Sequence, residues 1–327
     1  MNVLVTGGAG YVGSHAVRAL LEAGHRPVVV DNLSEGHRPA VGEAELIVGD
    51  LKDEDFVLAA LEESKAKAVM HFAASAYVGE SVENPQKYYF NNAVNSLRLL
   101  RAMRRRGVDR FVFSSSCTLY GVPDKVPITE DQPVRPISPY GRTKATVEWA
   151  LGDYAKAYGL RYASLRYFNA AGAAPDGSIG EDHDPEPHLI PLVIRAALGQ
   201  RDSITIFGTD YPTPDGTCIR DYVHVMDLAS VHVMAMEALD ERPATICNLS
   251  TGRGHSVREV IEVVKEVTGR DFPVVEGQRR PGDAPELVGS PEKVRSELGW
   301  EPQYPELATI VEHAWRWHSA HPDGFEG

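Results

Sequence analysis

The chain opens with the stretch Asn2-Val3-Leu4-Val5-Thr6-Gly7-Gly8-Ala9-Gly10-Tyr11-Val12-Gly13. An apolar run typical of a buried strand comes first, glycines follow at Gly7, Gly10 and Gly13, and a helical pattern then continues to Gly24. Backbone amides at a helix start bind anions, and glycine lets a phosphate approach closely. The order of strand, glycine turn and helix therefore predicts a doubly wound α/β fold whose first turn holds the pyrophosphate of a dinucleotide.

An acidic residue ends the second predicted strand. Asp31 stands eighteen residues after Gly13 and is followed by Asn32. A carboxylate at this place accepts hydrogen bonds from the hydroxyls of the adenosine ribose and repels a 2′-phosphate, so it favours NAD over NADP. The structural alternative is a glycine turn combined with a helix-capping aspartate.

Short apolar runs alternate with helical patterns through the first half of the chain. The predicted strands are residues 2–6, 27–31, 45–48, 68–73, 111–115 and 162–167. Continuous apolar strands separated by helices indicate a parallel Rossmann sheet covered on both faces. We expect residues 1–170 to form this NAD-binding domain. Residues 171–327 are expected to form mainly a smaller, interleaved α/β region for the substrate, with residues 220–250 returning to the sheet.

The composition of the chain argues against some classes of binding partner and indicates a cellular compartment. The 327 residues carry a net charge of −13, which works against binding to nucleic acid or to an anionic membrane surface. The chain begins on a strand pattern with no basic leader, and no apolar run is long enough for a membrane span. Three widely spaced cysteines favour free thiols in a reducing compartment. We therefore expect a cytoplasmic protein.

A second motif, Ser138-Pro139-Tyr140-Gly141-Arg142-Thr143-Lys144, predicts the reacting group. Ser138 suits a helix cap and Pro139 the first helical position, so Tyr140 and Lys144 lie one turn apart on one helical face. A phenol with a pKa of about 10 is a poor base at neutral pH, but a neighbouring ammonium and an oxidised nicotinamide both favour the phenolate. Tyr140 is therefore a candidate general base beside a hydride transfer.

Further motifs stand in the order seen in a known family. They are Val78-Gly79-Glu80-Ser81-Val82, Phe113-Ser114-Ser115-Ser116-Cys117-Thr118-Leu119-Tyr120-Gly121, Leu165-Arg166-Tyr167-Phe168-Asn169, Ile206-Phe207-Gly208-Thr209-Asp210-Tyr211-Pro212-Thr213, Arg220-Asp221-Tyr222-Val223-His224-Val225-Met226-Asp227-Leu228-Ala229 and Arg279-Arg280-Pro281-Gly282-Asp283. Nearly end to end, the chain resembles the extended short-chain dehydrogenases/reductases, and within them the UDP-glucose 4-epimerases. The resemblance implies reversible 4-epimerisation of a UDP-hexose, UDP-glucose to UDP-galactose, through a 4-keto sugar. It also implies a tightly bound NAD and a homodimer.

The resemblance also assigns roles by position. Tyr140 would take the proton of the sugar 4-hydroxyl, Lys144 would hold the nicotinamide ribose and lower the pKa of Tyr140, and Ser116 would hydrogen-bond the same sugar oxygen. The cofactor is expected against Gly7, Gly10, Tyr11, Val12, Gly13, Asp31, Asn32, Asp50, Leu51, Phe72, Ala73, Ala74, Asn91, Ser114, Tyr140, Lys144, Tyr167 and Phe168. The UDP-sugar is expected against Ser116, Tyr140, Asn169, His188, Leu189, Ile206, Phe207, Arg220, Arg280, Asp283 and Leu287.

Three positions depart from the family's pattern. Ala76 stands where a lysine often reaches the cofactor, and His188 stands where an asparagine usually contacts the nucleotide-sugar. Leu287 falls where a tyrosine excludes N-acetylated sugars in some members and a small residue admits them in others. The strength of NAD retention and the acceptance of UDP-N-acetylhexosamines are therefore open.

Other functions compete with this one. A 4-epimerase for UDP-N-acetylglucosamine or for a UDP-pentose or uronate shares the same motifs. A nucleotide-sugar dehydratase needs an Asp-Glu pair where this chain has Leu119-Tyr120, and a non-catalytic NAD-binding regulator has no need for Ser116, Tyr140 and Lys144. We expect no metal, because Glu181-Asp182-His183-Asp184 is typical of a solvated loop.

Overall fold

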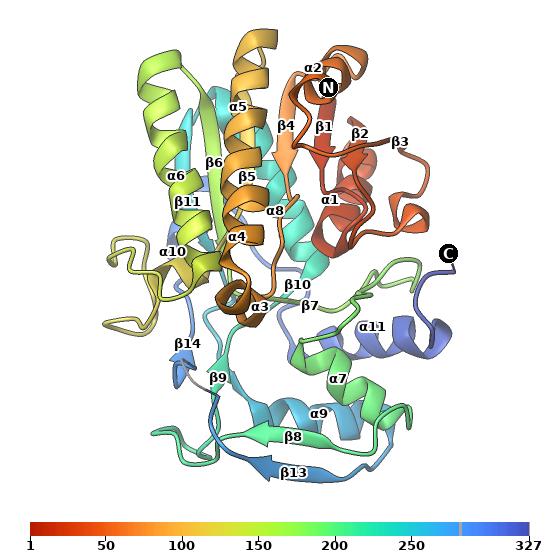
Figure 1. Ribbon diagram of the computed structural model, residues 1–327. Helices are drawn as coiled ribbons and strands as arrows, with labels where there is room; N and C mark the ends of the chain where they lie inside the picture. The colour runs from red at the N-terminus through yellow and green to blue at the C-terminus, as the bar shows by residue number, and fades with distance from the viewer. Residues whose placement is uncertain (281–282, 327) are drawn as a thin grey trace.

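A seven-stranded parallel sheet forms the centre of the molecule (Figure 1). The structure is a computed structural model that describes residues 1–280 and 283–326. The strands run in the order β11-β6-β5-β4-β1-β2-β3. They are β1 (Asn2–Thr6), β2 (Arg26–Asp31), β3 (Glu45–Val48), β4 (Ala68–His71), β5 (Arg110–Ser116), β6 (Arg161–Tyr167) and β11 (Ala244–Leu249). The predicted Rossmann-type α/β sheet is confirmed, and β11 pairs with β6 at its edge.

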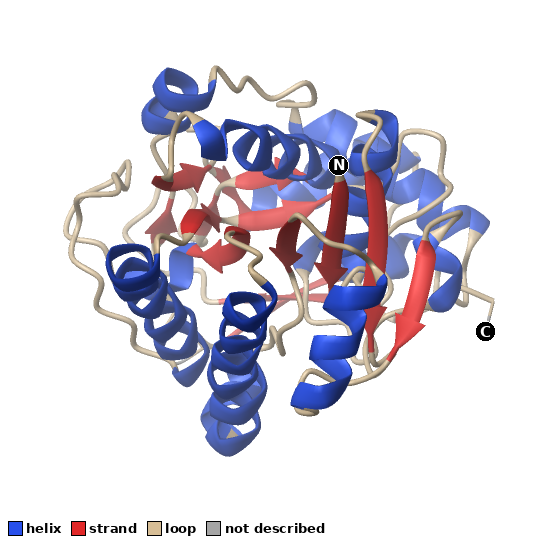
Figure 2. Ribbon diagram, turned by 90° about the horizontal axis from the view of Figure 1, so that it is seen from above, coloured by secondary structure: helices blue, strands red, loops and turns tan. Residues whose placement is uncertain are grey.

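Helices cover both faces of this sheet (Figure 2). On one face lie α1 (Tyr11–Glu22), α8 (Val225–Glu237) and α10 (Glu292–Leu298), and on the other lie α2 (Glu54–Glu63), α5 (Asn95–Arg106) and α6 (Pro139–Tyr158). Successive strand side chains point to opposite faces, so Val3 and Val5 join the core with α1 and α8 while Leu4 joins the core with α2 and α5. Both faces of the strands are therefore buried, which explains their continuous apolar runs.

One strand is shorter than its predicted run of residues 68–73. β4 ends at His71. The N–H groups of Phe72 and Ala73 both donate to the carbonyl oxygen of Thr6, at 2.8 and 3.0 Å, so the regular ladder stops there. The segment that follows β4 consequently lies beside the glycine turn at the end of β1.

The helix α6 carries the predicted Tyr140/Lys144 pair, and its start is as expected. Ser138 is the N-cap, its hydroxyl accepts a hydrogen bond from the N–H of Gly141 at 3.1 Å, and Pro139 is the first helical residue. The helix ends at Gly159, which adopts a left-handed conformation with φ +71°. Tyr140 and Lys144 thus lie in the first two turns of a rigid helix.

A smaller region lies below the carboxyl ends of the sheet in Figure 1. Its strand pairs are β7 (Asn169–Ala171) with β10 (Tyr222–His224) and β8 (Ile204–Phe207) with β13 (Val274–Gly277), and a third small sheet contains β9 (Ile219–Arg220), β12 (His255–Ser256) and β14 (Glu286–Leu287). Three helices, α7 (Leu189–Ala197), α9 (Val257–Thr268) and α11 (Leu307–Ala320), share a separate hydrophobic core with β7, β8 and β10. A second unit thus packs against the end of the sheet where the strands stop.

Short elements complete the chain. They are η1 (Arg38–Val41), α3 (Val78–Glu83), α4 (Pro85–Tyr88), the π-helical turn η2 (Tyr89–Val94), η3 (Cys117–Tyr120) and η4 (Ala238–Asp240). Within the described residues, no helix combines the length and the apolar character that crossing a bilayer requires. The three cysteines are buried free thiols.

Candidate active site

Three adjoining cavities follow the carboxyl ends of the central strands. Their volumes are about 320, 320 and 330 Å³. The glycine cavity contains Asp31 and Asp50, the tyrosine cavity contains Ser116 and Tyr140, and the arginine cavity contains Arg220 and Arg280. The order of strands reverses between β1 and β4, and ligands of doubly wound sheets bind at such a switch point.

The glycine cavity gathers most of the residues predicted to hold the adenosine end of a dinucleotide. Those that line it are Gly7, Gly10, Asp31, Asn32, Asp50, Leu51, Phe72, Ala73, Ala74 and Asn91. Asn91 belongs to the π-helical turn η2, a kind of distortion that is frequent at functional sites. Residues from five separate segments therefore meet at one cavity.

The glycine turn is shaped for close approach. A Cβ on Gly13 would lie 2.0 Å from the carbonyl oxygen of Gly7, and a Cβ on Gly7 would lie 2.4 Å from the backbone nitrogen of Ala73. Gly10 is the N-cap of α1 and provides no side-chain acceptor for the amides of the first helical turn. Those N–H groups are free to bind an anion at the positive end of the helix, so the turn fits a dinucleotide pyrophosphate.

Asp31 has a structural role as well as a predicted binding role. Its carboxylate accepts hydrogen bonds from the N–H of Ala9 at 3.0 Å and from the N–H of Leu33 at 2.9 Å. Burial raises its pKa, while these backbone bonds oppose the rise. The side chain fixes the glycine turn against β2, and because a carboxylate accepts about four hydrogen bonds, it retains capacity for ribose hydroxyls.

The tyrosine cavity joins the glycine turn to the predicted reacting groups. The predicted residues that line it are Gly7, Gly10, Tyr11, Val12, Gly13, Phe72, Ala74, Ser114, Ser116, Tyr140, Tyr167, Phe168, Asn169 and His188. Ser114 and Ser116 come from the end of β5, and the hydroxyl groups of Ser114 and Tyr167 are 3.0 Å apart. The expected cofactor and sugar positions are thus continuous in space.

Burial dominates the electrostatics of the reacting groups. It raises the pKa of Tyr140, and a hydrogen bond from Ser116 opposes this rise. Burial also lowers the pKa of Lys144 to about 7. The Lys144 ammonium donates to the carbonyl oxygen of Ser114 at 2.8 Å and lies 5.7 Å from the centre of the Tyr140 ring. In the structure Lys144 thus contacts the strand β5 and faces the ring of Tyr140 rather than bonding its hydroxyl.

A buried ion pair holds the inner face of α6. Glu148 accepts from the Arg166 guanidinium at 2.6 Å, and both side chains are nearly inaccessible to solvent, at 4% and 5% exposure. Ser115 and Ser164 also donate to Glu148, at 2.6 and 2.7 Å. Because Glu148 lies one turn after Lys144, this network fixes the helix against β5 and β6 at the level of the reacting groups.

The arginine cavity holds most of the residues predicted to bind the nucleotide. Asn169, His188, Leu189, Phe207, Arg220, Arg280 and Asp283 line it. The Arg280 guanidinium lies 3.9 Å from the centre of the Phe207 ring, and Arg220 lies 3.6 Å from the Asp283 carboxylate. Two cations and an exposed aromatic ring suit a nucleoside diphosphate.

A few predicted residues lie elsewhere. Ile206 is 1% exposed within β8 and lines none of the three cavities. Leu287 also lies outside their linings and packs beside the cluster that contains Cys117 and Phe168. Pro281 and Gly282 fall outside the described residues.

Several lining residues were not predicted. Glu35 and Tyr77 line the tyrosine cavity, and the Tyr77 hydroxyl donates to the Glu35 carboxylate at 3.2 Å. Glu181 and His183 line the same cavity. Glu35 and Tyr77 match no short motif, whereas the spacing of Glu181 and His183 was visible in the sequence and was interpreted as a solvated loop.

Comparison with known proteins decides the family. The chain matches the NAD dependent epimerase/dehydratase family over residues 3–250. This chain belongs to that family. The match covers the whole sheet, from β1 to β11, together with the glycine turn and the Tyr140/Lys144 pair.

Within the NAD dependent epimerase/dehydratase family, several UDP-glucose 4-epimerases are similar to this chain over nearly its whole length. That of Halalkalibacterium halodurans is 50% identical over 326 residues, 99% of this chain and 98% of its own length. The crystal structure of the Brucella ovis UDP-glucose 4-epimerase in complex with NAD is 50% identical, with a TM-score of 0.94 over 97% of this chain and 98% of its own. That of the Bifidobacterium longum enzyme in complex with NAD⁺ and UDP is 36% identical, with a TM-score of 0.94 over 99% and 100%.

Proposed function

We propose that this chain interconverts UDP-glucose and UDP-galactose by oxidising and re-reducing C4 of the sugar, with NAD as its resident cofactor. One observation carries the proposal. The tyrosine cavity places Tyr140 and Ser116 beside the glycine turn of a chain that matches UDP-glucose 4-epimerases over its full length. The glycine turn and Asp31 would hold NAD, which would supply the acceptor and donor for the hydride of C4.

The protein residues supply binding and proton transfer. Tyr140 accepts the proton of the sugar 4-hydroxyl and returns it when C4 is reduced on its other face. Ser116 is held by Thr118, whose hydroxyl and N–H donate to the Ser116 oxygen at 3.0 and 3.2 Å. Ser116 can in turn donate to the sugar oxygen. Lys144 is the cation one helical turn away, and positive charge there favours the Tyr140 phenolate.

The proposed reaction requires tight binding of the nucleotide and weak binding of the hexose, because the sugar must rotate between the two hydride transfers. Arg220 and Arg280 bind the diphosphate, Phe207 packs on the uracil, and Asp283 accepts from the uridine ribose. All four residues line the arginine cavity. Binding energy placed on UDP, away from the reacting carbon, holds the substrate while leaving the hexose free to rotate.

Product identity tests this function. The purified chain is incubated with UDP-galactose, and the nucleotide-sugars are separated and identified by NMR. UDP-glucose is the expected product. A 4-keto-6-deoxy sugar would indicate a dehydratase, and no conversion in the presence of added NAD would indicate a non-catalytic NAD-binding protein.

We further propose that the chain is a homodimer that pairs through the α6 side of the sheet. Val82, Phe90 and Trp149 are 65%, 56% and 61% exposed, and they lie on α3, η2 and α6, of which α6 contacts both α3 and η2. Exposed apolar groups gathered in this way mark a protein interface. Light scattering after size exclusion should give twice the chain mass, and Trp149→Asp should shift the mass toward the monomer. A wild-type chain that elutes as a monomer at micromolar concentration would contradict the dimer.

We also propose which part of the chain binds the cofactor, which part binds the substrate, and where in the cell the protein lies. Residues 1–170 hold most of the cofactor, residues 171–327 hold most of the UDP-sugar, and β11 with α8 returns the second part to the sheet. The three free thiols and the net charge of −13 support a cytoplasmic location.

A further inference from the structure

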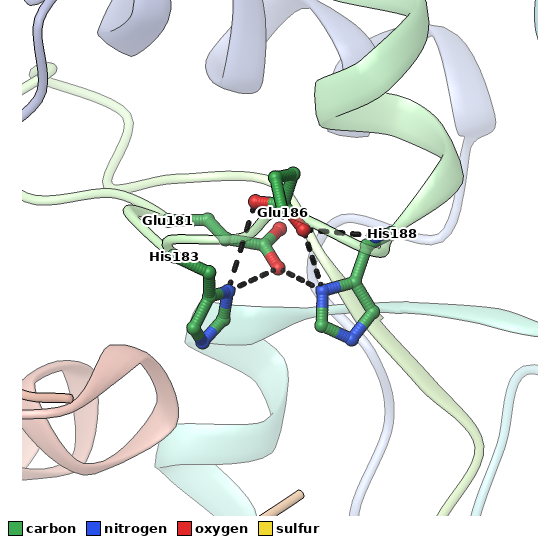
Figure 3. Close-up of side chains that lie close together, drawn as sticks. All are labelled: Glu181, His183, Glu186 and His188. Atoms are coloured by element: carbon green, nitrogen blue, oxygen red, sulfur yellow. Dashed lines mark hydrogen bonds and ion pairs between the residues drawn. The ribbon is translucent and has the colours of Figure 1, made fainter. Parts of the chain in front are cut away.

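Four side chains of one loop converge beside the tyrosine cavity. The loop joins β7 to α7 and contributes Glu181, His183, Glu186 and His188 (Figure 3). One ligand atom from each residue lies within 4.8 Å of all the others. The residues span only eight positions, so a single short segment supplies two imidazole nitrogens and two carboxylates.

The spacing of these atoms matches a tetrahedral metal site. The Nδ1 atom of His188 lies 2.7 Å from Glu181 and 2.9 Å from Glu186, and the Nδ1 atom of His183 lies 3.1 and 3.7 Å from the same two carboxylates. Metal–ligand bonds of about 2.0–2.1 Å give a tetrahedron with edges of roughly 3.3 Å. The two distances to Glu186 end on different oxygen atoms, Oε1 for His188 and Oε2 for His183. The four ligand atoms lie within 4.8 Å of one another, so one ion requires the Glu186 carboxylate to turn and the four side chains to draw together.

One oxygen of the two buried carboxylates lacks a hydrogen-bond donor. The side chains of Glu181 and Glu186 are 3% and 0% exposed. The Oε2 atom of Glu186 is buried and accepts no hydrogen bond, and the Nδ1 atom of His183 lies 3.7 Å from it. A buried carboxylate oxygen is costly without a partner. A cation between the two carboxylates and the two Nδ1 atoms satisfies it.

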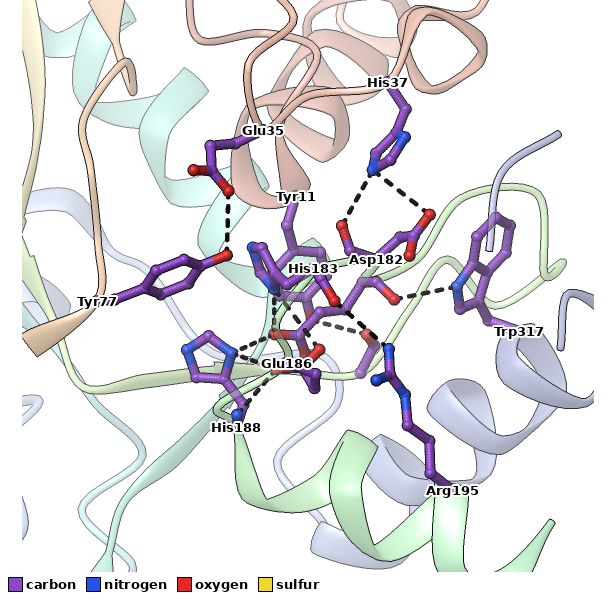
Figure 4. Close-up of polar contacts among 12 residues, drawn as sticks. Tyr11, Glu35, His37, Tyr77, Asp182, His183, Glu186, His188, Arg195 and Trp317 are labelled. Carbon is purple, nitrogen blue, oxygen red and sulfur yellow. Dashed lines mark hydrogen bonds and ion pairs between the residues drawn. The ribbon is translucent and has the colours of Figure 1, made fainter. Parts of the chain in front are cut away.

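Neighbouring elements hold the loop in place (Figure 4). The Trp317 indole N–H donates to the carbonyl oxygen of Glu181 at 3.3 Å, and Arg195 donates to that of His183 at 3.5 Å. The N–H of His188 donates to the Glu186 carboxylate at 2.8 Å. These contacts orient the ligands from outside, as partners around a metal site do.

We propose that Glu181, His183, Glu186 and His188 form a binding site for one zinc ion. Two imidazoles and two carboxylates in tetrahedral reach favour zinc over magnesium or calcium, which prefer six or more oxygen ligands. Because the protein fills all four positions, the site is structural, with no open position for a reacting water. This departs from our sequence expectation of no metal, which considered Glu181 and His183 without Glu186 and His188.

The proposed zinc site adjoins the cavities that we assign to the substrate. His183 and His188 line the tyrosine cavity, and His188 also lines the arginine cavity. In Figure 3 the second ring nitrogen of His188 points away from the cluster. A zinc ion at Nδ1 therefore leaves Nε2 protonated, a hydrogen-bond donor at the junction of the two cavities.

Metal content tests the proposal. The chain is expressed in medium with zinc and other first-row metals, freed of any purification tag, and analysed by mass spectrometry of its metals. We expect about one zinc per chain in the wild type and in Asp184→Asn, a control at an exposed position of the same loop outside the cluster. We expect less than about a tenth in Glu186→Gln, which removes one charged ligand and keeps the side-chain shape.

A stability measurement covers the case in which Glu186→Gln folds poorly. Zinc added back to chelator-treated wild type should raise Tm by roughly 5 °C. Wild type with less than about a tenth of a zinc per chain, or equal zinc in wild type and Glu186→Gln, would show a metal-free cluster of ion pairs and overturn the proposal. Turnover of UDP-galactose is followed on the same samples. If the zinc-free chain remains active, the proposed function stands. The zinc proposal and the proposed function can therefore be rejected independently of each other.

Discussion

Burial and chemistry oppose each other at Tyr140. The apolar surroundings raise the pKa of its phenol and lower the pKa of Lys144 to about 7. Both shifts disfavour charge in a site whose proposed reaction needs a phenolate. The hydrogen bond from Ser116 opposes the rise in the pKa of Tyr140. A charged Lys144, one helical turn away, would also favour the phenolate.

Removal of the phenol hydroxyl tests this assignment. Tyr140→Phe should lower kcat at least a hundredfold, because the proton acceptor is lost while the ring still packs. UDP binding, followed by calorimetry, should stay within about twofold of wild type because its contacts lie in the arginine cavity. A variant with more than about a tenth of the wild-type activity would remove Tyr140 from the role of base.

Removal of one partner of the buried Glu148–Arg166 pair should be strongly destabilising. Glu148→Gln leaves a buried guanidinium without its charge partner, and we expect a loss of about 3 kcal/mol in the free energy of unfolding. The control is Glu22→Gln, which breaks the exposed pair with Arg18 and should change it by less than about 1 kcal/mol. Urea denaturation followed by circular dichroism measures both. Equal midpoints would mean that the buried pair adds little.

At the scale of elements, the start of α1 depends on close backbone contact. Gly13→Ala would place a Cβ 2.0 Å from the carbonyl oxygen of Gly7, so the turn must open. We expect this variant to lose its NAD during purification. Gly24→Ala, at a left-handed position with no atom near the new Cβ, should cost about 1 kcal/mol of stability and keep its NAD. Absorbance and chromatography of the heat-released nucleotide measure both, and equal NAD contents would argue against the pyrophosphate site.

The short strand β14 carries the position expected to set sugar size. Leu287 packs beside Phe168, which lines the tyrosine cavity, although Leu287 itself does not. We expect weak turnover of UDP-N-acetylglucosamine. Leu287→Ser should raise kcat/KM for that substrate about tenfold and Leu287→Tyr should abolish it, with UDP-glucose affected little, because methylene-sized changes in a pocket are worth about 1–3 kcal/mol. Unchanged values in both variants would place Leu287 outside the sugar site.

For the whole molecule, the sequence predicted the features that depend on local residue patterns, namely strands and a helix start. Apolar runs and helical periodicity predicted six strands of the sheet, and capping residues predicted the start of α6. Asp31 was expected to face a ribose, but its bond to Ala9 depends on the fold. The Glu148–Arg166 pair and the convergence of Glu186 with Glu181 likewise arise from packing between segments, which no single motif records.

The tyrosine cavity shares lining residues with both the glycine cavity and the arginine cavity, and this continuity gives the central claim its clearest test. If the proposed reaction proceeds with NAD bound throughout, the hydride that leaves C4 must return to the same sugar. UDP-galactose with deuterium at C4 is incubated with purified chain and no added NAD, and the product is analysed by NMR. We predict UDP-glucose that retains the deuterium at C4. Loss of the deuterium to solvent or to free nucleotide, or a strict need for added NAD, would contradict the account.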